Sequence, residues 1–204
     1  MNKNITLKVS RGLFNSKYLP LLGCGTRYLV LYGGAGSGKS VFAVQRFLLR
    51  LLSEKGRNLL VVRAVSNTNR DSTFAAFKQV ISSWGLYDLF RVNESDMRIR
   101  AVNGSTVVFK GLDDSEKLKS ITFENGVLTD IWVEEASEVS QSDFNQLDIR
   151  LRGNGPKKQI VISFNPTDVN HWLKKRFIDP FDANVTVVHG TYLDNAFLDD
   201  DYKK

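Results

Sequence analysis

The residue types and spacing that most clearly predict chemistry lie in the stretch YLVLYGGAGSGKSVF, from Tyr28 to Phe42. Its central motif, GGAGSGKS, matches the pattern G-x-x-x-x-G-K-[ST] of phosphate-binding loops that connect a strand to a helix. In such a loop the glycines let backbone N–H groups point at the phosphates, and the following helix adds its positive N-terminal end. Lys39 is expected to reach the β- and γ-phosphates, and Ser40 to bind Mg²⁺. The predicted phosphate-binding residues are Gly33, Gly34, Ala35, Gly36, Ser37, Gly38, Lys39 and Ser40.

Two adjacent carboxylates follow a second apolar run, in the sequence VLTDIWVEEASEV. Glu134 and Glu135 come directly after the run from Val127 to Val133. Beside a phosphate loop, Glu134 can hold the Mg²⁺ shell through water, and Glu135 can orient and deprotonate an attacking water. The second glutamate therefore favours hydrolysis of a nucleoside triphosphate over phosphoryl transfer to a metabolite hydroxyl.

A third polar group follows the apolar run in IVISFNPTDVNHW. Ser163, Asn165 and Pro166 come just past a predicted strand, where small polar groups could sense the γ-phosphate or the attacking water. An ordinary strand-to-loop turn explains the same residues equally well, because Asn-Pro commonly starts a turn. His171 and Trp172 are expected to pack as a pair on the next helix rather than to catalyse a reaction.

The length fits one large domain or two small ones, and the composition is globular with a basic charge balance. The chain has 204 residues, of which 42% are hydrophobic, and a formal net charge of +6. A basic balance favours polyanionic partners, but the charges are spread along the chain and do not decide whether nucleic acid binds. One cysteine and two histidines give neither an internal disulfide nor a zinc-binding pattern. Without a long apolar run or a leader sequence, we expect no membrane insertion or secretion, and an intracellular location.

The candidate residues are positioned by apolar strand-like runs that alternate with amphipathic stretches, which predicts an α/β fold with a mainly parallel sheet and crossover helices. One helix is predicted from Lys39 to about Ser53, and a second from about Asp71 to Trp84. The segment MRIRAVNGSTVVFKG alternates on both sides of Asn103–Gly104, which predicts an antiparallel hairpin insertion. The predicted parallel strands are Tyr28–Tyr32, Leu59–Arg63, Leu128–Val133, Gln159–Ser163 and Val185–His189.

Several segments, taken in order, resemble one family of P-loop ATPases. Between about Thr26 and Phe197 these segments are RYLVLYGGAGSGKS, VVRAVSNTNRDSTFAAF, GLDDSEKLKSI, IWVEEASEV, LDIRLRG, ISFNP and GTYLDN. The sequence resembles the ATPase domain of the large terminase subunit of tailed bacteriophages and prophages, the motor that drives DNA into the empty capsid. The first and fourth segments fit many P-loop ATPases, whereas the middle segments and their order make the resemblance specific.

The resemblance implies a P-loop NTPase fold of the additional-strand, catalytic-glutamate (RecA-like) type, with ATP and Mg²⁺ as cofactors. On these positions, Gly33–Ser40 would be the Walker A loop, Glu134 the metal-associated acid of Walker B, and Glu135 the catalytic glutamate. The segment Ser163–Phe164–Asn165 would be the coupling motif that links hydrolysis to movement, with Asn165 among the residues that bind the nucleotide.

Two positions depart from the family pattern and leave open which cation stabilises the charge on the transferring phosphoryl oxygens. Many relatives carry an arginine inside the phosphate loop, where this chain has Ala35, and another before the Walker B strand, where this chain has Lys119. The candidates for such a finger, from the same chain or from a neighbouring subunit, are Lys119, Arg63, Arg150 and Arg152.

A complete large subunit in this family continues into an RNase H-like nuclease domain. Residues 1–204 are therefore expected to form a single ATPase domain without that nuclease domain or its activity, and residues 1–25 a peripheral N-terminal segment. The resemblance implies double-stranded DNA, the portal protein and the small terminase subunit as partners, and no membrane. It also implies a homo-oligomeric ring during packaging, a monomer for the isolated domain, and the cytoplasm of the bacterial host as the location.

Two other functions stay open from the sequence. A small-molecule or nucleoside kinase would need an acceptor pocket and a lid with several arginines, and the Glu134–Glu135 pair and the hairpin argue against it. A nucleotide-dependent switch or assembly module would bind nucleotide without measurable turnover. The residues that contact adenine are equally open, because Phe14, Tyr18 and Tyr28 could stack on the base or belong to the core.

Overall fold

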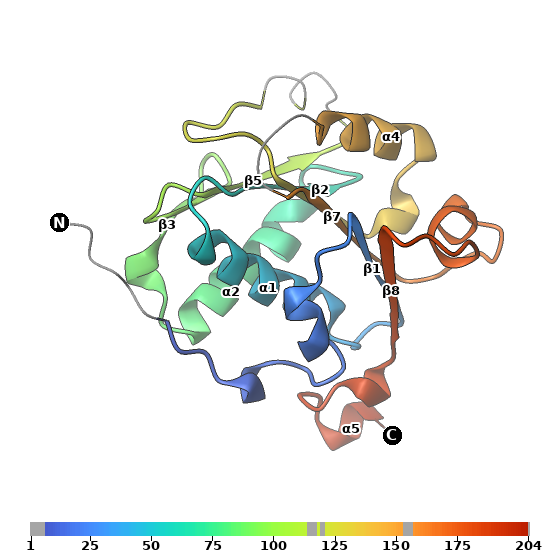
Figure 1. Ribbon diagram of the computed structural model, residues 1–204. Helices are drawn as coiled ribbons and strands as arrows, with labels where there is room; N and C mark the ends of the chain where they lie inside the picture. Colours follow the sequence, from blue (N-terminus) through green and yellow to red (C-terminus); the bar gives the residue numbers. More distant parts are fainter. Residues whose placement is uncertain (1–6, 114–117, 119–120, 153–156, 204) are drawn as a thin grey trace.

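The central element of the structure is one β-sheet with helices packed on both faces (Figure 1). This computed structural model describes residues 7–113, 118, 121–152 and 157–203. In that part of the chain the sheet has eight strands, in the order β3-β4-β5-β2-β6-β7-β1-β8. The strands are β1 (Tyr28–Gly33), β2 (Asn58–Arg63), β3 (Phe90–Asn93), β4 (Arg98–Ala101), β5 (Thr106–Gly111), β6 (Asp130–Glu134), β7 (Gln159–Phe164) and β8 (Val185–Gly190).

The strands from β5 to β8 across the sheet run parallel, and β3 and β4 form an antiparallel edge. Every residue of β2 and of β7 is buried, as expected for strands that are covered on both faces. Because β6, β7 and β1 are parallel neighbours, their carboxyl ends meet at one edge of the sheet. Gly33, Glu134 and Phe164 are the last residues of these three strands, so the fold gathers the predicted site residues at that edge.

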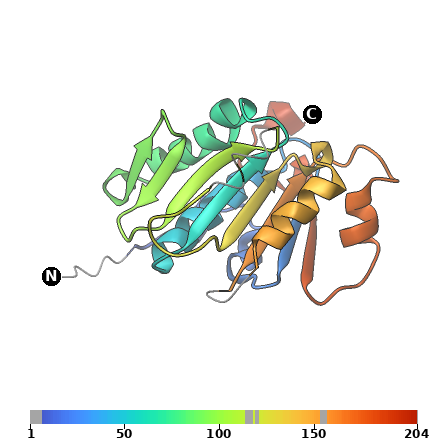
Figure 2. The same ribbon diagram turned by 90° about the horizontal axis from the view of Figure 1, so that it is seen from above.

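Helices α1 and α2 cover one face of the sheet, and α4 covers the other (Figure 2). Helix α1 (Lys39–Ser53) and helix α2 (Ala75–Ser83), which follows a π-helical turn (Arg70–Phe74), pack into a core cluster around Trp132. Helix α4 (Gln141–Arg150) packs into a second cluster on the opposite face. None of the helices in the described residues is both long and apolar enough to span a membrane. The other helical segments are α5 (Asp200–Lys203), a π-helical turn (Lys174–Ile178) and 3-10 turns at Arg11–Leu13, Leu19–Gly23, Tyr87–Leu89, Ala136–Glu138 and Tyr192–Asp194.

The predicted elements agree closely with the structure. All the predicted parallel strands are present with small shifts at their ends, and the helix from Lys39 to Ser53 is confirmed. The hairpin around Asn103–Gly104 is confirmed as the antiparallel pair of β4 and β5. The sequence did not predict β3, because its four residues, FRVN, are too short to show a clear alternation.

The N-terminal segment is less peripheral than predicted. Phe14 and Tyr18 are buried in the same core cluster as α1. The ring of Tyr18 stacks on Phe42 of α1 with 5.2 Å between centroids, and Phe14 meets Trp84 edge-on at 5.6 Å. The prediction differed from the structure because this segment lies outside the alternating pattern of strands and helices. Its aromatic side chains nevertheless bury apolar area against α1 and α2.

Candidate active site

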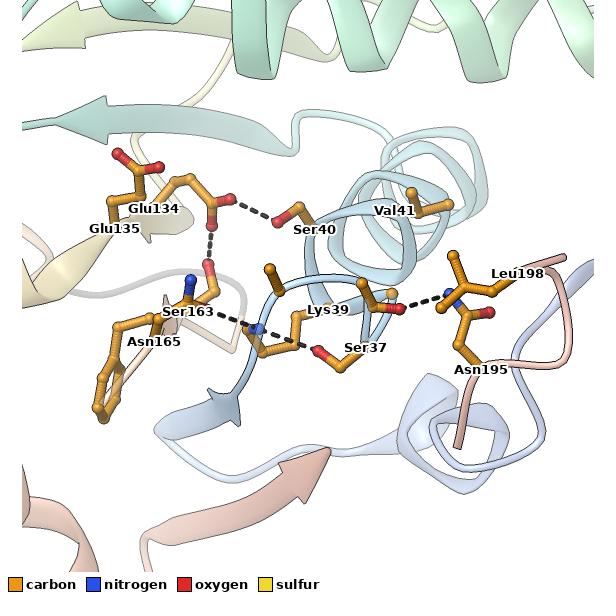
Figure 3. A pocket seen from close by; sticks show the side chains of 14 residues that line it. Ser37, Lys39, Ser40, Val41, Glu134, Glu135, Ser163, Asn165, Asn195 and Leu198 are labelled. Atoms are coloured by element: carbon orange, nitrogen blue, oxygen red, sulfur yellow. Dashed lines mark hydrogen bonds between the residues drawn. The ribbon is translucent and has the colours of Figure 1, made fainter. Parts of the chain in front are cut away.

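Most of the predicted site residues, namely residues 35–40, Glu134, Glu135 and Asn165, line one cavity of about 370 Å³ at the carboxyl edge of β1, β6 and β7 (Figure 3). The loop after β1 contributes residues 35–41, the end of β6 contributes Glu134 and Glu135, and the end of β7 contributes Ser163 and Asn165. Asn195 and Leu198, from the segment after β8, complete the wall on the other side of the loop.

The phosphate loop adopts a conformation that requires glycine. Gly33 has a φ of +142°, and a Cβ atom there would lie 1.7 Å from the backbone oxygen of Gly190 in β8. Gly36 and Gly38 have φ values of +74° and +84°, in the left-handed region that favours glycine. Helix α1 begins at Lys39 directly after the loop, so the positive end of its dipole lies at the cavity.

The ammonium group of Lys39 lies at the centre of the loop. Its Nζ atom donates to the backbone oxygens of Gly33 at 2.9 Å and Gly34 at 2.8 Å, and to Ser37 Oγ at 2.9 Å. It also donates to Asn165 Oδ1 at 3.0 Å, which joins the end of β7 to the phosphate loop. All these acceptors are neutral, so they hold the ammonium in place without cancelling its charge.

Glu134 bridges two hydroxyl groups on opposite sides of the cavity. Its Oε1 atom accepts a hydrogen bond of 2.5 Å from Ser40 Oγ, and its Oε2 atom accepts one from Ser163 Oγ. The Ser163 hydroxyl in turn accepts from Trp132 Nε1 at 2.6 Å, inside the core. Ser163 therefore positions Glu134, a contact that the sequence did not predict.

The charges of Lys39 and Glu134 influence each other across the loop. Exclusion of water raises the pKa of Glu134 above its ordinary value, and the hydroxyls of Ser163 and Ser40 and the charges of Arg63 and Lys39 oppose this rise. Burial lowers the pKa of Lys39, and the negative charge of Glu134 opposes that change. Both groups are therefore held in an environment that penalises their charges, which is typical of functional sites.

Glu135 lies at the mouth of the same cavity but points differently from Glu134 (Figure 3). It has a φ of +52°, a left-handed conformation that is unusual for glutamate. Its carboxylate forms an ion pair with the guanidinium of Arg63, and its side chain stays 47% exposed. Arg63, at the end of β2, is held by Ser72 Oγ at 2.7 Å and by the backbone oxygen of Thr68 at 3.2 Å.

None of the described finger candidates, Arg63, Arg150 and Arg152, lines the cavity itself. Arg150 ends α4 and donates to the backbone oxygen of Ile121 at 3.1 Å. The next residue, Leu151, accepts from Arg27, which precedes β1, so Arg150 and Arg152 lie at the amino edge of the sheet, away from the phosphate loop. Within a single chain their side chains therefore do not serve the cavity. Lys119 lies outside the described residues.

The three aromatic residues that could stack on the adenine base pack into the protein core instead. Tyr18 is fully buried, and Phe14 is 6% exposed. Tyr28 packs against Phe177 with 5.2 Å between centroids, and its hydroxyl donates to Asp148 Oδ2 at 2.9 Å. None of the three lines the cavity or the smaller pocket beside it. His171 and Trp172 form the expected packed pair, with ring centroids 5.9 Å apart.

That smaller pocket, of about 140 Å³, adjoins the phosphate loop at Gly38. Leu13, Val41 and Phe197 line it, and they are 42%, 50% and 60% exposed. Exposed apolar side chains around a pocket make it a candidate binding groove. The sequence did not single out these three residues, because they come from separate segments and share no spacing.

Two asparagines that the sequence did not identify hold the loop from outside. Asn195 Nδ2 donates to the backbone oxygen of Gly36 at 2.7 Å, and Asn15 Nδ2 donates to that of Ser37 at 3.3 Å. Asn195 ends the segment GTYLDN, which contributed to the family resemblance without a role assigned to this residue.

A divalent cation would find only part of its ligands in the protein. In the described residues no group of three or more His, Cys, Asp or Glu side chains is arranged to hold a metal ion. Ser40 Oγ and the Glu134 carboxylate, 2.5 Å apart, are both hard oxygen donors. This set fits Mg²⁺, which usually keeps several waters and takes further ligands from substrate phosphates.

Comparison with known proteins places the chain in a family. The family model of the phage terminase large subunit matches residues 26–204. The PBSX phage terminase large subunit of Bacillus subtilis (strain 168) is 38% identical over 196 residues, which cover 87% of this chain and 44% of that protein. The terminase large subunit of Bacillus phage SPP1 is 33% identical over 178 residues, covering 83% of this chain and 42% of that protein. The chain thus spans less than half the length of these curated relatives.

The solved structures agree with this fold. The large terminase of a thermophilic bacteriophage superposes with a TM-score of 0.77 at 17% identity, over 92% of this chain and 48% of that one. The complex of the same terminase with ADP gives a TM-score of 0.74 at 20% identity, with the same coverage. From the match over residues 26–204 and the identity to two curated relatives, we conclude that this chain belongs to the phage terminase large subunit family.

Proposed function

We propose that this chain is an ATP-hydrolysing motor domain that couples hydrolysis of Mg–ATP to the translocation of double-stranded DNA into a phage procapsid. The observation that carries the proposal is the convergence of Lys39 and Ser40, which follow β1, and of Glu134 and Glu135, at the end of β6, on one cavity. The family assignment gives this arrangement its biological setting.

The phosphate loop would bind the triphosphate of ATP. Within the part of the chain that the structure describes, the ammonium of Lys39 is held by neutral acceptors only, so its charge is available to the β- and γ-phosphates. Ser40 and Glu134 would hold Mg²⁺ together with phosphate oxygens and water. A bound Mg²⁺ supplies charge neutralisation on the transferring phosphoryl group.

Glu135 would act as the general base that takes a proton from the attacking water. Its carboxylate is partly exposed at the cavity mouth, where water has access, and Arg63 fixes its direction. A base must lie within hydrogen-bond reach of the proton that it abstracts. We therefore assign to Arg63 the positioning of Glu135. Asn165 and Ser163 would connect the nucleotide to the end of β7 through their contacts with Lys39 and Glu134.

The base of the nucleotide would lie in the smaller pocket beside Gly38. The pocket follows the phosphate loop over the first turn of α1 and is lined by Leu13, Val41 and Phe197. These exposed apolar side chains can cover both faces of a flat ring, which gives them a reason to be exposed. In the large terminase of the thermophilic bacteriophage, ADP is the ligand of one solved structure.

The DNA-contacting surface would lie on the antiparallel edge of the sheet. Arg100 of β4 faces Arg91 of β3, and strand alternation puts Arg98 and Lys110 on the same sheet face. Arg100 pairs with Glu124 at 2.6 Å, whereas no ion pair of Arg91, Arg98 or Lys110 exists in the described part of the chain. Cations without acidic partners can neutralise DNA phosphates and release counterions.

The family assignment also supports a proposal about the assembly in which this domain would work. The bacteriophage φ29 genome packaging motor assembly, a further structural neighbour, has a TM-score of 0.60 at 13% identity. We propose a homo-oligomeric ring that contacts the portal protein and the small terminase subunit in the cytoplasm of the host, and a monomer for the isolated domain. We expect no nuclease activity from residues 1–204.

The decisive experiment measures phosphate release from Mg–ATP, with and without double-stranded DNA, for the wild type and for Glu135→Gln. We expect the substitution to reduce turnover roughly 10²- to 10⁴-fold while ATP still binds, because it removes the general base and keeps the shape of the side chain. The matched control is Glu138→Gln, an exposed glutamate in the same turn that does not line the cavity.

Three outcomes would contradict the proposal. Unchanged turnover in Glu135→Gln would remove Glu135 from the role of base. Transfer of phosphate to an acceptor rather than to water would favour a kinase. Nucleotide binding without turnover, even with DNA and at high protein concentration, would favour a switch or assembly module.

A further inference from the structure

The phosphate loop is held from outside by two asparagines that lie far apart in the sequence. Asn15 belongs to the N-terminal segment and Asn195 to the segment after β8. Their side chains donate to the backbone oxygens of Ser37 and Gly36, at 3.3 Å and 2.7 Å. Figure 3 shows the bond from Asn195 on the side of the loop away from Glu134 and Ser163.

Both asparagines use the same arrangement of bonds. Asn15 Oδ1 accepts from the backbone N–H of Lys17 at 3.0 Å, and Asn195 Oδ1 accepts from that of Phe197 at 3.1 Å. Each side-chain oxygen thus closes a turn with the residue two positions ahead, which leaves the NH₂ group to point at the loop. Asn15 is 5% and Asn195 7% exposed, so both side chains are held firmly. Only asparagine combines this acceptor and donor on such a short side chain: aspartate lacks the donor, and serine is shorter.

The hydrogen bonds from the two asparagines fix the direction of a carbonyl group, and with it the direction of the N–H group in the same peptide. In a trans peptide the C=O of one residue and the N–H of the next point in opposite directions. A bond that holds the Gly36 oxygen outward therefore turns the N–H of Ser37 inward, and a bond that holds the Ser37 oxygen outward turns the N–H of Gly38 inward. Among the described residues these two N–H groups have no backbone acceptor.

We propose that Asn15 and Asn195 are positioning residues that preorganise the Ser37 and Gly38 amides for the phosphates of the nucleotide. The inference rests on the proposed function, because it assumes that this loop binds phosphate. Without these bonds, the glycine-rich loop can rotate its peptides freely, and ATP binding must then order them at an entropic cost. The effect on affinity is indirect, through the backbone.

Other contacts keep the two asparagines in place. Asp194, the neighbour of Asn195, forms an ion pair with Lys17 at 3.4 Å, which joins the N-terminal segment to the segment after β8. Asp194 also accepts from the backbone N–H of Thr191 at 2.8 Å, in a capping box, and that N–H lowers the pKa of Asp194. The two segments therefore meet each other as well as the loop.

The test compares Asn195→Leu and Asn195→Asp with the wild type in their affinity for a non-hydrolysable Mg–ATP analogue. Leucine removes both bonds without adding charge, whereas aspartate keeps the acceptor for Phe197, loses the donor to Gly36 and adds a negative charge, so the leucine variant controls for the effect of charge. We expect each variant to bind roughly three- to tenfold more weakly, as for the loss of one hydrogen bond. We expect KM for ATP to rise by a similar factor, with kcat changed less than twofold.

A spectroscopic measurement separates positioning from general destabilisation. In the variants without ligand, the NMR amide signals of Ser37 and Gly38 should broaden or shift, while those of α4 stay unchanged. The matching variants Asn15→Leu and Asn15→Asp should change the amide signal of Gly38 more strongly than that of Ser37, because Asn15 binds the Ser37 oxygen. The control is Asn184→Ala, an exposed asparagine whose NH₂ group donates to Asp182 at 3.1 Å, away from the loop.

The possible failures can be told apart. If the wild type does not bind the analogue, the proposed function fails. If the wild type binds but Asn195→Asp and Asn15→Asp bind as tightly as it does, the positioning inference fails and the proposed function stands. If Asn195→Leu unfolds, the aspartate variants, which keep the local turns, decide the question.

Discussion

At the residue scale, two adjacent glutamates are given different environments. Glu134 ends β6 and bridges Ser40 and Ser163 inside the cavity. Glu135, the next residue, turns away with a φ of +52° and pairs with Arg63 at the cavity mouth. The change in backbone conformation between them separates the carboxylate that we propose to hold Mg²⁺ from the one that we propose to face the attacking water. A non-glycine residue in such a conformation costs folding energy, and this kind of strain tends to occur at functional sites.

The pKa of Glu134 predicts a conflict between stability and function. Exclusion of water raises this pKa above its ordinary value of 4.5. The folded protein then binds the proton more tightly than the unfolded chain does, so the stability from this group is present below pH 4.5 and is lost as the pH rises through the folded-state pKa. At neutral pH the ionised carboxylate therefore contributes less to stability than the protonated carboxyl would.

We expect Glu134→Gln to unfold at a higher temperature than the wild type at pH 7 to 8, by about 2–4 °C for each 1 kcal/mol of relief in a domain of this size. The gain should shrink as the pH falls, while hydrolysis is reduced at every pH. Thermal unfolding followed by circular dichroism at several pH values measures this. Glu138→Gln is again the control, and a lower Tm for Glu134→Gln at pH 7 would refute the expectation.

At the scale of elements, the antiparallel hairpin gives the sheet a basic edge. Arg91 and Arg100 are directly opposite each other on β3 and β4. Like charges in such a pair are destabilising unless an anion is near. Arg100 forms an ion pair with Glu124. Arg98 and Lys110 line a groove of about 550 Å³ together with Arg70, Asp96 and Asp113. Arg91, Arg98, Arg100 and Lys110 therefore form a basic surface whose like charges repel one another, and such a surface favours a polyanionic partner.

We therefore expect Arg91→Glu and Arg98→Glu to weaken binding to double-stranded DNA. Each lost phosphate contact should reduce the slope of log affinity against log salt by about 0.9, because fewer counterions are released. Fluorescence anisotropy with a labelled duplex at several salt concentrations measures both quantities. Lys55→Glu, at an exposed residue in the turn just after α1, makes the same change of charge elsewhere. An equal loss of affinity in that control would show that only net charge matters.

At the scale of the whole molecule, the single chain leaves the phosphoryl-stabilising cation unassigned. Arg63 is engaged with Glu135, Arg150 and Arg152 lie at the amino edge of the sheet, and Lys119 lies outside the described residues. We propose that a neighbouring subunit supplies this cation, as a ring assembly would allow.

We expect the specific ATPase activity to rise with protein concentration, because association would complete the site. Mixing inactive Glu135→Gln chains with inactive Lys119→Ala chains should restore part of the activity if Lys119 acts on a neighbour, and the same design applies to Arg150→Ala. Phosphate release over a hundredfold range of concentration is the measurement. A flat profile would mean that one chain carries a complete site.

Much of the fold and part of the site could be predicted from the sequence. The strand and helix patterns are local, because burial on one or two faces imposes a period on consecutive residues. The phosphate loop is local as well, since its motif needs only glycines, a lysine and a hydroxyl in one stretch. The burial of Phe14 and Tyr18 could not be predicted in this way, because it depends on a surface formed by distant helices.

By itself, the sequence determined the phosphate loop, the acidic pair and the strands that carry them. Only the tertiary structure decided which side chains meet, because that depends on the strand order. The order β6-β7-β1 brings Ser40 to Glu134 across 94 positions of sequence, and the place of β2 beside β6 brings Arg63 to Glu135. The bond from Asn195 to Gly36 spans 159 positions and follows from the place of β8 beside β1. Such contacts are set by the packing of the whole chain, and residue spacing does not encode them.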